Sequence, residues 1–306
     1  ITAGTHTVYM LASRWGGAGT VMIRDPSLSA VFIPSTDSEL LACGDSGPLV
    51  WLWASLLSDP IRQCTLQVPQ NGLVFLSADG TAAYSDGEYE AEFRFGVDST
   101  AGDQDTQRWV NVYSDAGDGT DEQLAMSSYR VVGPGEHTFY LIGMRTIGTG
   151  TATMWNPTLT AIFVPSLGSD VVTCASWGQE WSTTVAEPSV VAQCTADLPR
   201  AGWAYLSADG SLGEWDGAYE AHFRMQIDDS DGDLGIDRWV DVYTDTGDGT
   251  DKSFRLSSLT PVDAGEHDFM LMGRRSNGSG TVKAYDPSMS VFILPKLVVF
   301  LPLVMR

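Results

Sequence analysis

The sequence predicts an all-β protein: two tandem antiparallel β-sandwich domains, jelly-roll-like in their rhythm, preceded by an N-terminal orphan β-hairpin. Three observations predict this fold. The segment from Cys64 to Pro165 aligns without a gap with Cys194 to Pro295, at an offset of about 130 residues, a length typical of a sandwich domain. Apolar residues recur with period two within each copy. Gly and Asp clusters separate these runs roughly every 8 to 12 residues, as in sandwiches and jelly rolls.

Both copies carry the same motifs in the same order. In the first copy they are LSADG (76–80), YEAEFR (89–94), RWVNVYSDAGDGTD (108–121) and GEHTFYLIGMR (135–145). In the second they are LSADG (206–210), YEAHFR (219–224), RWVDVYTDTGDGTD (238–251) and GEHDFMLMGRR (265–275). The closing hairpin occurs a third time, because residues 4–35 match 135–166 and 265–295.

These boundaries divide the chain into four parts. They are an orphan hairpin (1–35), a first repeat with a Cys-containing lead segment (36–165), a second repeat with its own lead segment (166–295) and an apolar C-terminal strand (296–306). Because an isolated hairpin is only marginally stable, we expect the first part to complete a sheet elsewhere. The chain opens at Ile1 without a charged and apolar leader, so we expect a processed chain or a fragment.

Local patterns specify the strands and turns. The segment 89–97 alternates apolar residues (Tyr89, Ala91, Phe93) with charged ones (Glu90, Glu92, Arg94). This alternation predicts a strand with one buried and one solvent-exposed face. The glycines of 148–150 supply the positive φ angles of a hairpin turn. Each hairpin then has Asp or Asn before Pro, which predicts a strand edge or bend.

The four cysteines occupy matched positions at the end of each lead segment and the start of each repeat body. We predict two disulfides, Cys43 with Cys64 and Cys174 with Cys194, each closing a loop of about 20 residues and contributing roughly 3 kcal/mol. A zinc site is less consistent with the sequence, since there is no CxxC pair. The pairing indicates an oxidising compartment and hence a secreted, extracellular or cell-surface protein.

Charge excludes several partners. With 39 acidic and 17 basic residues the net charge is −22, which would repel a phosphate backbone and an anionic lipid surface alike. We therefore expect no nucleic acid partner. The longest apolar stretch, 291–305, is interrupted by Pro295, Lys296 and Pro302, so we expect no membrane-spanning segment.

The acidic loops predict calcium as a candidate cofactor. Asp side chains two or three residues apart around glycines supply the hard oxygen ligands that Ca²⁺ prefers. The alternative is Asp-Gly turn chemistry without metal. The candidate ligands are Asp98, Asp103, Asp105, Asp115, Asp118 and Asp121 in the first copy and Asp228, Asp231, Asp233, Asp245, Asp248 and Asp251 in the second.

No pattern of catalytic residues stands out, and we predict a protein that is not an enzyme. His6, His137 and His267 occupy the same position in the three hairpins, which favours a structural hydrogen bond at a strand start over a catalytic base. Tryptophans could form a sugar-binding platform, although packing of the large rings in cores is the alternative. The candidates are Trp51, Trp53, Trp177, Trp181, Trp203 and Trp215.

The C-terminal segment is β-prone and almost wholly apolar, so it must be buried in its own domain or in a neighbour. Its assembly candidates are Leu297, Val298, Val299, Phe300, Leu301, Leu303 and Val304. An orphan hairpin at one end and an apolar strand at the other predict head-to-tail contacts, in which strands of one subunit complete a sheet of the next.

The hairpin GTHTVYML (4–11), its continuation GTVMIRDPSLSAVFIP (19–34) and the tail FLPLVMR (300–306) together carry a family resemblance. They resemble extracellular repeat proteins of Chloroflexota-type bacteria, whose chains carry a YLPLVxR-like segment. The resemblance implies secretion and β repeats, and it assigns no catalytic residue.

The sequence therefore predicts a structural subunit of a bacterial extracellular filament, sheath or surface layer, a homopolymer assembled by β-strand complementation. The first alternative is an adhesin that binds glycans through exposed Trp residues. The second is a hydrolase with a hidden pair of carboxylates, although an enzyme site should break the symmetry between the repeats.

Overall fold

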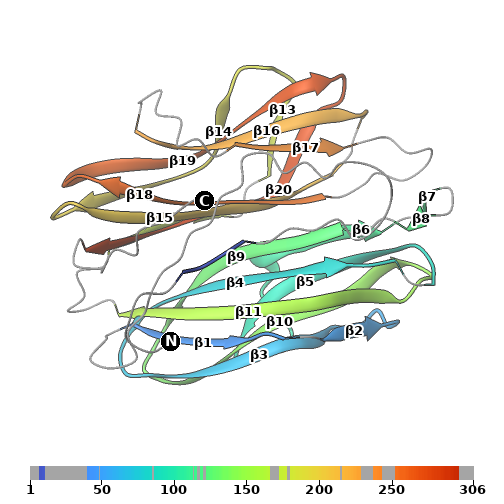
Figure 1. Cartoon of the computed structure of the whole chain (residues 1–306), viewed down its shortest axis with the longest axis horizontal. Coiled ribbons are helices and arrows are strands. Elements are labelled where there is room, and N and C mark those ends of the chain that lie inside the picture. Colours follow the sequence, from blue (N-terminus) through green and yellow to red (C-terminus); the bar gives the residue numbers. More distant parts are fainter. Residues whose placement is uncertain are drawn as a thin grey trace.

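Two jelly-roll sandwiches make up most of the described part of the chain (Figure 1). The computed structural model describes residues 7–10, 40–47, 49–84, 86–112, 114–115, 118–119, 122–165, 172–177, 180–213, 216–228, 237–242 and 252–295. Among these residues the helical element is the short 3-10 helix η1 (Gln104–Thr106). The predicted all-β fold class with two antiparallel sandwiches is confirmed. The predicted orphan hairpin, apart from 7–10, and the predicted C-terminal strand lie outside the described residues.

The first unit contains strands β1 (Leu41–Asp45), β2 (Val50–Trp53), β3 (Asp59–Val68), β4 (Gly72–Ala82), β5 (Tyr89–Val97), β6 (Arg108–Val112), β7 (Ser114–Asp115), β8 (Asp118–Gly119), β9 (Glu122–Val132), β10 (Gly135–Gly148) and β11 (Ala152–Pro165). One sheet has the order β1-β11-β4-β9, with β2 also paired to β11, and the other has the order β3-β10-β5-β6. Neighbours such as β4 and β11 are far apart in the chain, which is the jelly-roll arrangement.

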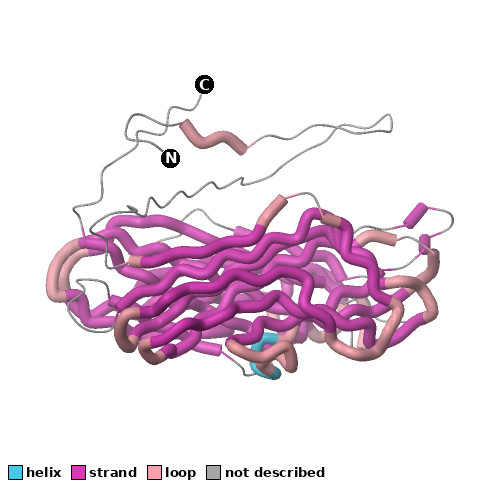
Figure 2. The backbone as a smooth tube through the Cα atoms, turned by 90° about the horizontal axis from the view of Figure 1, so that it is seen from below, coloured by secondary structure: helices cyan, strands magenta, loops and turns pink. Residues whose placement is uncertain are grey.

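The second unit contains β12 (Val172–Trp177), β13 (Trp181–Thr183), β14 (Ser189–Leu198), β15 (Gly202–Leu212), β16 (Tyr219–Ile227), β17 (Asp237–Val242), β18 (Lys252–Val262), β19 (Gly265–Gly278) and β20 (Val282–Pro295). Its sheets, β12-β20-β15-β18 with β13 on β20 and β14-β19-β16-β17, repeat the topology of the first unit. We call β1-β11-β4-β9 and β12-β20-β15-β18 the facing sheets. The long strands of both units run side by side across the molecule (Figure 2).

Each unit has its own core between its two sheets. On β5 the residues Tyr89, Ala91, Phe93 and Phe95 are buried in the core of the first unit, as the period-two pattern predicts. The prediction that Glu92 faces solvent is wrong: it is 4% exposed, because it pairs with Arg94 and accepts a hydrogen bond from Gln107. Each fully buried Phe stabilises the fold by about 1.5–3 kcal/mol relative to an exposed one. The second unit repeats this core with its own residues, among them Phe223.

The turns follow the predicted chemistry. Gly148 has φ 92°, and a Cβ there would lie 2.3 Å from the carbonyl oxygen of Glu88, so only glycine fits. Asn156 before Pro157 has φ 47°, and the pairing of β11 with β4 shifts its register between Trp155 and Thr158. The Asn-Pro step is therefore a bulge within a continuing strand.

Both predicted disulfides are present, Cys43–Cys64 and Cys174–Cys194. Each joins a strand of a facing sheet to a strand of the other sheet, because β1 and β3, and likewise β12 and β14, belong to different sheets. The bond therefore fastens the two layers of each sandwich at one edge. In the described part of the chain no helix is long and apolar enough to cross a bilayer.

Candidate functional site: the buried contact between the units

The two units meet along one side of the first sandwich. On that side both of its sheets end, one with β9 and the other with β6. These two strands pack against β15, β18 and β20 in the facing sheet of the second unit (Figure 1). Equivalent positions of the two repeats meet at Glu122 with Lys252 and at Phe75 with Tyr205, whereas the centre of the contact joins the non-equivalent positions Arg108 and Asp209.

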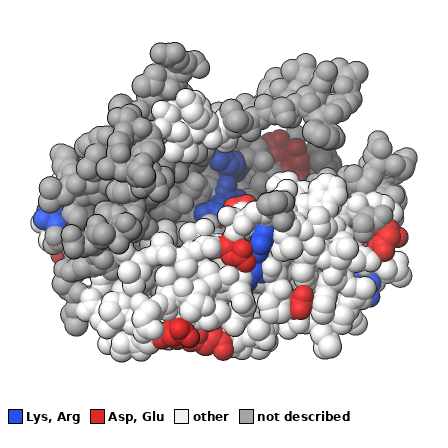
Figure 3. All heavy atoms as spheres, turned by 60° about the horizontal axis from the view of Figure 1, so that its bottom comes forward, with Lys and Arg blue, Asp and Glu red and all other residues white. Residues whose placement is uncertain are grey.

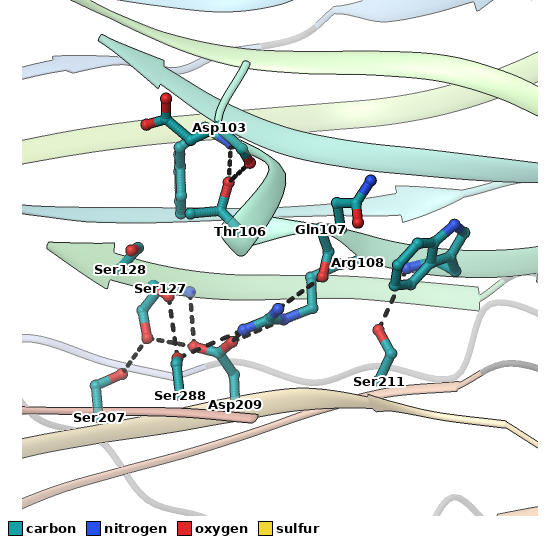
Figure 4. Close-up of polar contacts among 12 residues, drawn as sticks. Asp103, Thr106, Gln107, Arg108, Ser127, Ser128, Ser207, Asp209, Ser211 and Ser288 are labelled. Carbon is teal, nitrogen blue, oxygen red and sulfur yellow. Dashed lines mark hydrogen bonds and ion pairs between the residues drawn. The ribbon is translucent and has the colours of Figure 1, made fainter. Parts of the chain in front are cut away.

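A buried ion pair occupies the centre of this contact (Figure 4). Arg108 on β6 is 1% exposed and Asp209 on β15 is 0% exposed. The Arg108 Nε donates to Asp209 Oδ1 at 2.8 Å, and Nη2 donates to the same oxygen. The other guanidinium nitrogen, Nη1, donates to the Gln107 carbonyl at 2.7 Å, which fixes the conformation of the arginine.

Hydroxyl groups complete the network. The backbone N–H of Ser127 on β9 donates to Asp209 Oδ2 at 2.7 Å, and the Ser127 hydroxyl donates to the same oxygen. The Ser127 and Ser207 hydroxyls lie 3.1 Å apart, and the Ser288 hydroxyl donates to the Ser127 carbonyl at 3.2 Å. Both carboxylate oxygens of Asp209 thus accept hydrogen bonds from the first unit, as a buried charge requires.

Strand alternation explains why Asp209 faces the first unit. Ala204, Leu206 and Ala208 on β15 are buried in the second unit's own core. Successive side chains on a strand point to opposite faces, so Ser207 and Asp209 point out of that core and toward the first unit. In the motif LSADG, Leu206 and Ala208 therefore pack in the core of the second unit, while Ser207 and Asp209 contact the first unit.

Apolar and charged contacts flank the network. At one end the ring of Phe75 lies 4.8 Å from that of Phe292, edge to face, and 6.1 Å from that of Tyr205. At the other end Lys252 Nζ lies 2.7 Å from Glu122 Oε1. These flanking contacts exclude water from the central pair and so strengthen its electrostatic interactions.

The ring of Trp109 packs edge to face against Tyr285 at 6.4 Å, and the Trp109 backbone N–H donates to the Ser211 hydroxyl at 3.2 Å. The residue after Arg108 therefore takes part in the contact as well. The aromatic contact extends the interface beyond the buried charge, toward the turn of the second unit's closing hairpin.

Comparison with known proteins assigns no family. No family model matches the sequence, and no curated protein matches it. Among solved structures, PNGase F, a glycosylasparaginase from Flavobacterium meningosepticum, aligns over 84% of this chain and 96% of its own, with 9% identity and a TM-score of 0.32. The tandem CBM22 domains of Xyn10C from Paenibacillus barcinonensis align over 82% and 92%, with 10% identity and a TM-score of 0.21. These TM-scores support no inference about this chain.

The predicted calcium ligands that are described bind protein groups. Asp98 accepts from the Thr138 N–H at 2.8 Å and pairs with His137, while Asp103 and Asp105 both pair with Arg130, at 2.8 and 2.6 Å. Asp228 pairs with His267 at 2.8 Å. The described part of the chain contains no group of three or more His, Cys, Asp or Glu side chains that could hold a metal ion. The side chains of Asp115, Asp118, Asp121, Asp231, Asp233, Asp245, Asp248 and Asp251 lie outside the described residues, so calcium there stays a prediction.

The histidine prediction is confirmed at both described hairpins. The Nδ1 atoms of His137 and His267 lie 2.7 and 2.8 Å from the carboxylates of Asp98 and Asp228, near the starts of β10 and β19. The hydrogen bond to Asp98 raises the pKa of His137 despite partial burial. Burial raises the pKa of Asp98, but the hydrogen bonds from Thr138 and His137 outweigh it, and the net pKa is below the usual value. His6 lies outside the described residues.

The tryptophan candidates divide. Trp51 is buried and packs on Phe93, and Trp181 packs on Phe223, so these two rings are core rather than platform. Trp53 and Trp203 are half-buried, while the side chains of Trp177 and Trp215 lie outside the described residues. The most exposed described tryptophans are Trp155 and Trp239, at 44% and 48%, which the sequence reasoning did not select.

Several basic side chains in the described part of the chain pair with acidic ones. Arg62 pairs with Asp45 at 3.0 Å, and Lys283 pairs with Glu180 at 2.7 Å. On the face shown in Figure 3, Lys and Arg side chains lie close to Asp and Glu side chains rather than forming a broad patch of their own.

Sequence reasoning missed the central pair. The signal was present, because the Arg-Trp of RWV and the Asp of LSADG occur at equivalent positions in both repeats, as Arg108 and Arg238, and as Asp79 and Asp209. The missing information was the three-dimensional juxtaposition of the units, which repeat alignment does not supply.

Proposed function

We propose that this chain is a structural subunit of an extracellular filament, sheath or surface layer, in which β-sandwich repeats are joined in fixed orientation, and that it is not an enzyme. The observation that carries the proposal is the buried contact around Arg108 and Asp209. At its centre it joins two repeats through non-equivalent residues, and contacts between non-equivalent surfaces are the type that extends an assembly unit by unit.

Two further features support a cohesive role. The disulfides Cys43–Cys64 and Cys174–Cys194 fasten the two layers of each sandwich, which suits a protein that works outside the reducing cytosol. The charged pair at the centre of the contact has demanding geometry, and buried polar groups of this kind fix register in some assemblies. We infer that here it fixes the orientation of one repeat on the next.

The decisive experiment measures assembly directly. The purified full chain is studied by sedimentation velocity over a wide concentration range and by negative-stain electron microscopy. We expect concentration-dependent association and linear or sheet-like particles. A strictly monomeric chain at all concentrations, with calcium and with chelator, would contradict the proposal.

The role predicted for the apolar tail is tested in the same way. A variant that lacks 297–306 removes Leu297 through Val304, and we expect it to fold while assembling less. Unchanged assembly would show that the tail does not connect subunits by strand complementation. The subunits would then have to be joined through another surface.

A second candidate function is glycan binding, favoured by the exposure of Trp155 and Trp239. Stacking of sugar rings on exposed indoles would make each of them a subsite. A glycan array probed with the wild-type chain and with Trp155→Ala and Trp239→Ala variants tests it. Glycan binding that both substitutions abolish would support the adhesin hypothesis, whereas an array on which the wild-type chain binds no glycan would reject it.

A further inference from the structure

The second unit carries a group of polar and aromatic side chains on its outer sheet, β14-β19-β16-β17, which lies on the side away from the first unit (Figure 1). On β16 the side chain of Phe223 points into the core. Because side chains alternate along a strand, His222 and Arg224 point outward. The strand register places Trp239 of β17 on one side of His222 and Arg274 of β19 on the other.

Trp239 is held as an exposed aromatic platform. Its ring stacks on the imidazole of His222, with ring centroids 4.1 Å apart and an interplanar angle of 14°. The orientation of the imidazole is fixed, because His222 Nδ1 accepts from Arg274 Nε at 3.0 Å and His222 Nε2 donates to Asp237 Oδ1 at 2.6 Å. Trp239 itself remains 48% exposed. A fixed indole of this kind offers a flat apolar surface with a polar edge, which suits a sugar ring.

Two arginines beside the platform lack a carboxylate partner among the described residues. In the first unit Arg94 pairs with Glu92, but the equivalent Arg224 has His222 in place of that carboxylate. The buried Nε atom of Arg224 has no hydrogen-bond partner in the described part of the chain. Arg274 uses its Nε for His222, and its terminal nitrogens bind no described group. This face therefore presents positive charge that a bound anion would neutralise.

The equivalent face of the first unit lacks the same features. Met144 stands at the position of Arg274, so the second guanidinium is missing. Trp109 stands at the position of Trp239, but it is half-buried and packs against Tyr285 of the second unit. The group is therefore a property of the second unit and does not follow from the sandwich fold that both units share.

The acidic residues of the face indicate which kind of anion fits. Asp241 on β17 is exposed, and the register pairs it with the half-buried Glu220 on β16. Ionised carboxylates only accept hydrogen bonds, so they favour a ligand that also has donors. A saccharide with a carboxylate has both, a negative group for the arginines and hydroxyls for the acids. A chain of phosphates has repeated charge without such donors, and the net charge of −22 would repel it.

We propose that this face binds an acidic saccharide, a short chain of uronic acid residues, with one sugar ring on Trp239 and a carboxylate on Arg274 and Arg224. Side chains two positions apart on a strand lie about 7 Å apart, so a ligand stacked beside His222 reaches both arginines. The inference rests on the glycan-binding candidate, whose site and ligand class it names, and not on assembly. Because the first unit lacks the group, one chain binds one ligand.

Calorimetric titration of the full chain with trigalacturonate is the direct test. We expect binding at one site per chain. The fully methyl-esterified trisaccharide keeps the sugar rings and loses the negative charges, so it should bind on the order of tenfold more weakly, because the charge-assisted hydrogen bonds to the arginines are lost. Trp239→Ala removes the platform and should abolish the binding of both ligands.

The repeat supplies matched variants. Arg224→Gln should weaken trigalacturonate binding on the order of tenfold, whereas Arg94→Gln, at the equivalent position of the first unit, should leave it unchanged. A triple variant, His222→Glu with Asp237→Gln and Arg274→Met, installs side chains that the outer sheet of the first unit already accommodates. It should bind the acid no more tightly than the ester. Melting curves confirm that each variant is folded.

The outcomes separate the ligand from the site. If acid and ester bind wild type equally, or if Arg224→Gln and Arg94→Gln weaken binding equally, these arginines do not recognise a carboxylate. If neither ligand binds wild type, the proposal is wrong, and the glycan array decides the glycan-binding candidate with other sugars. Inorganic phosphate that binds as tightly as trigalacturonate would reveal a general anion site and would also overturn the proposal. Assembly is measured separately by sedimentation, and none of these results decides it.

Discussion

The buried ion pair makes a sharp prediction about stability, because the chain contains its own control. Asp209→Ala removes a carboxylate that accepts hydrogen bonds from the Arg108 guanidinium and from the backbone and side chain of Ser127. The substitution leaves a guanidinium that is 1% exposed without its hydrogen-bonded carboxylate. Breaking a buried pair by removing one partner costs about 3–5 kcal/mol. At about 1.4 kcal/mol per tenfold, the midpoint of this range is a factor of roughly a thousand in the unfolding equilibrium.

The matched control is Asp79→Ala, which removes the same residue from the same LSADG motif in the first unit, where the side chain is exposed. Exposed substitutions away from special features change stability by about 0.5 kcal/mol or less. Urea unfolding of dilute protein, followed by Trp fluorescence, measures both free energies of unfolding. Equal losses for the two variants, or a loss below about 1 kcal/mol for Asp209→Ala, would refute the reasoning that the contact depends on this pair.

Three further predictions concern the units themselves. Because folding raises the pKa of His137, its contribution to stability is complete below the unfolded pKa of 6.5 and is lost as pH rises through the folded pKa. Because folding lowers the pKa of Asp98, its contribution to stability is present above the unfolded pKa of 3.8 and is lost as pH falls through the folded pKa. The stability advantage of wild type over His137→Gln should therefore peak between about pH 4 and 6.5 at no more than about 1 kcal/mol, and a pH-independent difference in calorimetry would contradict it. Cys43→Ser with Cys64→Ser should lower stability by about 3 kcal/mol, and a reducing agent should then affect only the bond between Cys174 and Cys194. Gly143→Ala places a Cβ 2.7 Å from Ile61 Cδ1 in the core and should cost about 1–3 kcal/mol, whereas Gly133→Ala, with nothing nearer than 3.7 Å, should stay within about 0.5 kcal/mol by thermal melting.

Local features of the fold were predictable because they depend on residues close in sequence or on the repeat. The alternation around Phe93 determines which face of β5 is buried, and the matched cysteines determine the two pairings. The glycine at 148 and the Asn-Pro step at 156–157 specify their turn and bulge through backbone geometry. The jelly-roll topology itself was predicted only in outline, since strand order depends on long-range packing that no local pattern encodes.

The contact between the units could not be predicted from either copy alone. Asp79 and Asp209 have the same neighbours in sequence, yet one is exposed and the other is 0% exposed. The environment of each residue follows from which unit lies beside it, and that is a property of the pair of units.

This difference explains why repeats that share their motifs can serve different purposes. The Asp of the LSADG motif is present in both copies but is buried in only one of them. Burying its carboxylate costs free energy unless a cation pairs with it, so Asp79 stays in contact with water. The exposed Asp79 and the buried Asp209 therefore show that one motif serves a solvent-exposed strand surface in the first repeat and a contact between repeats in the second.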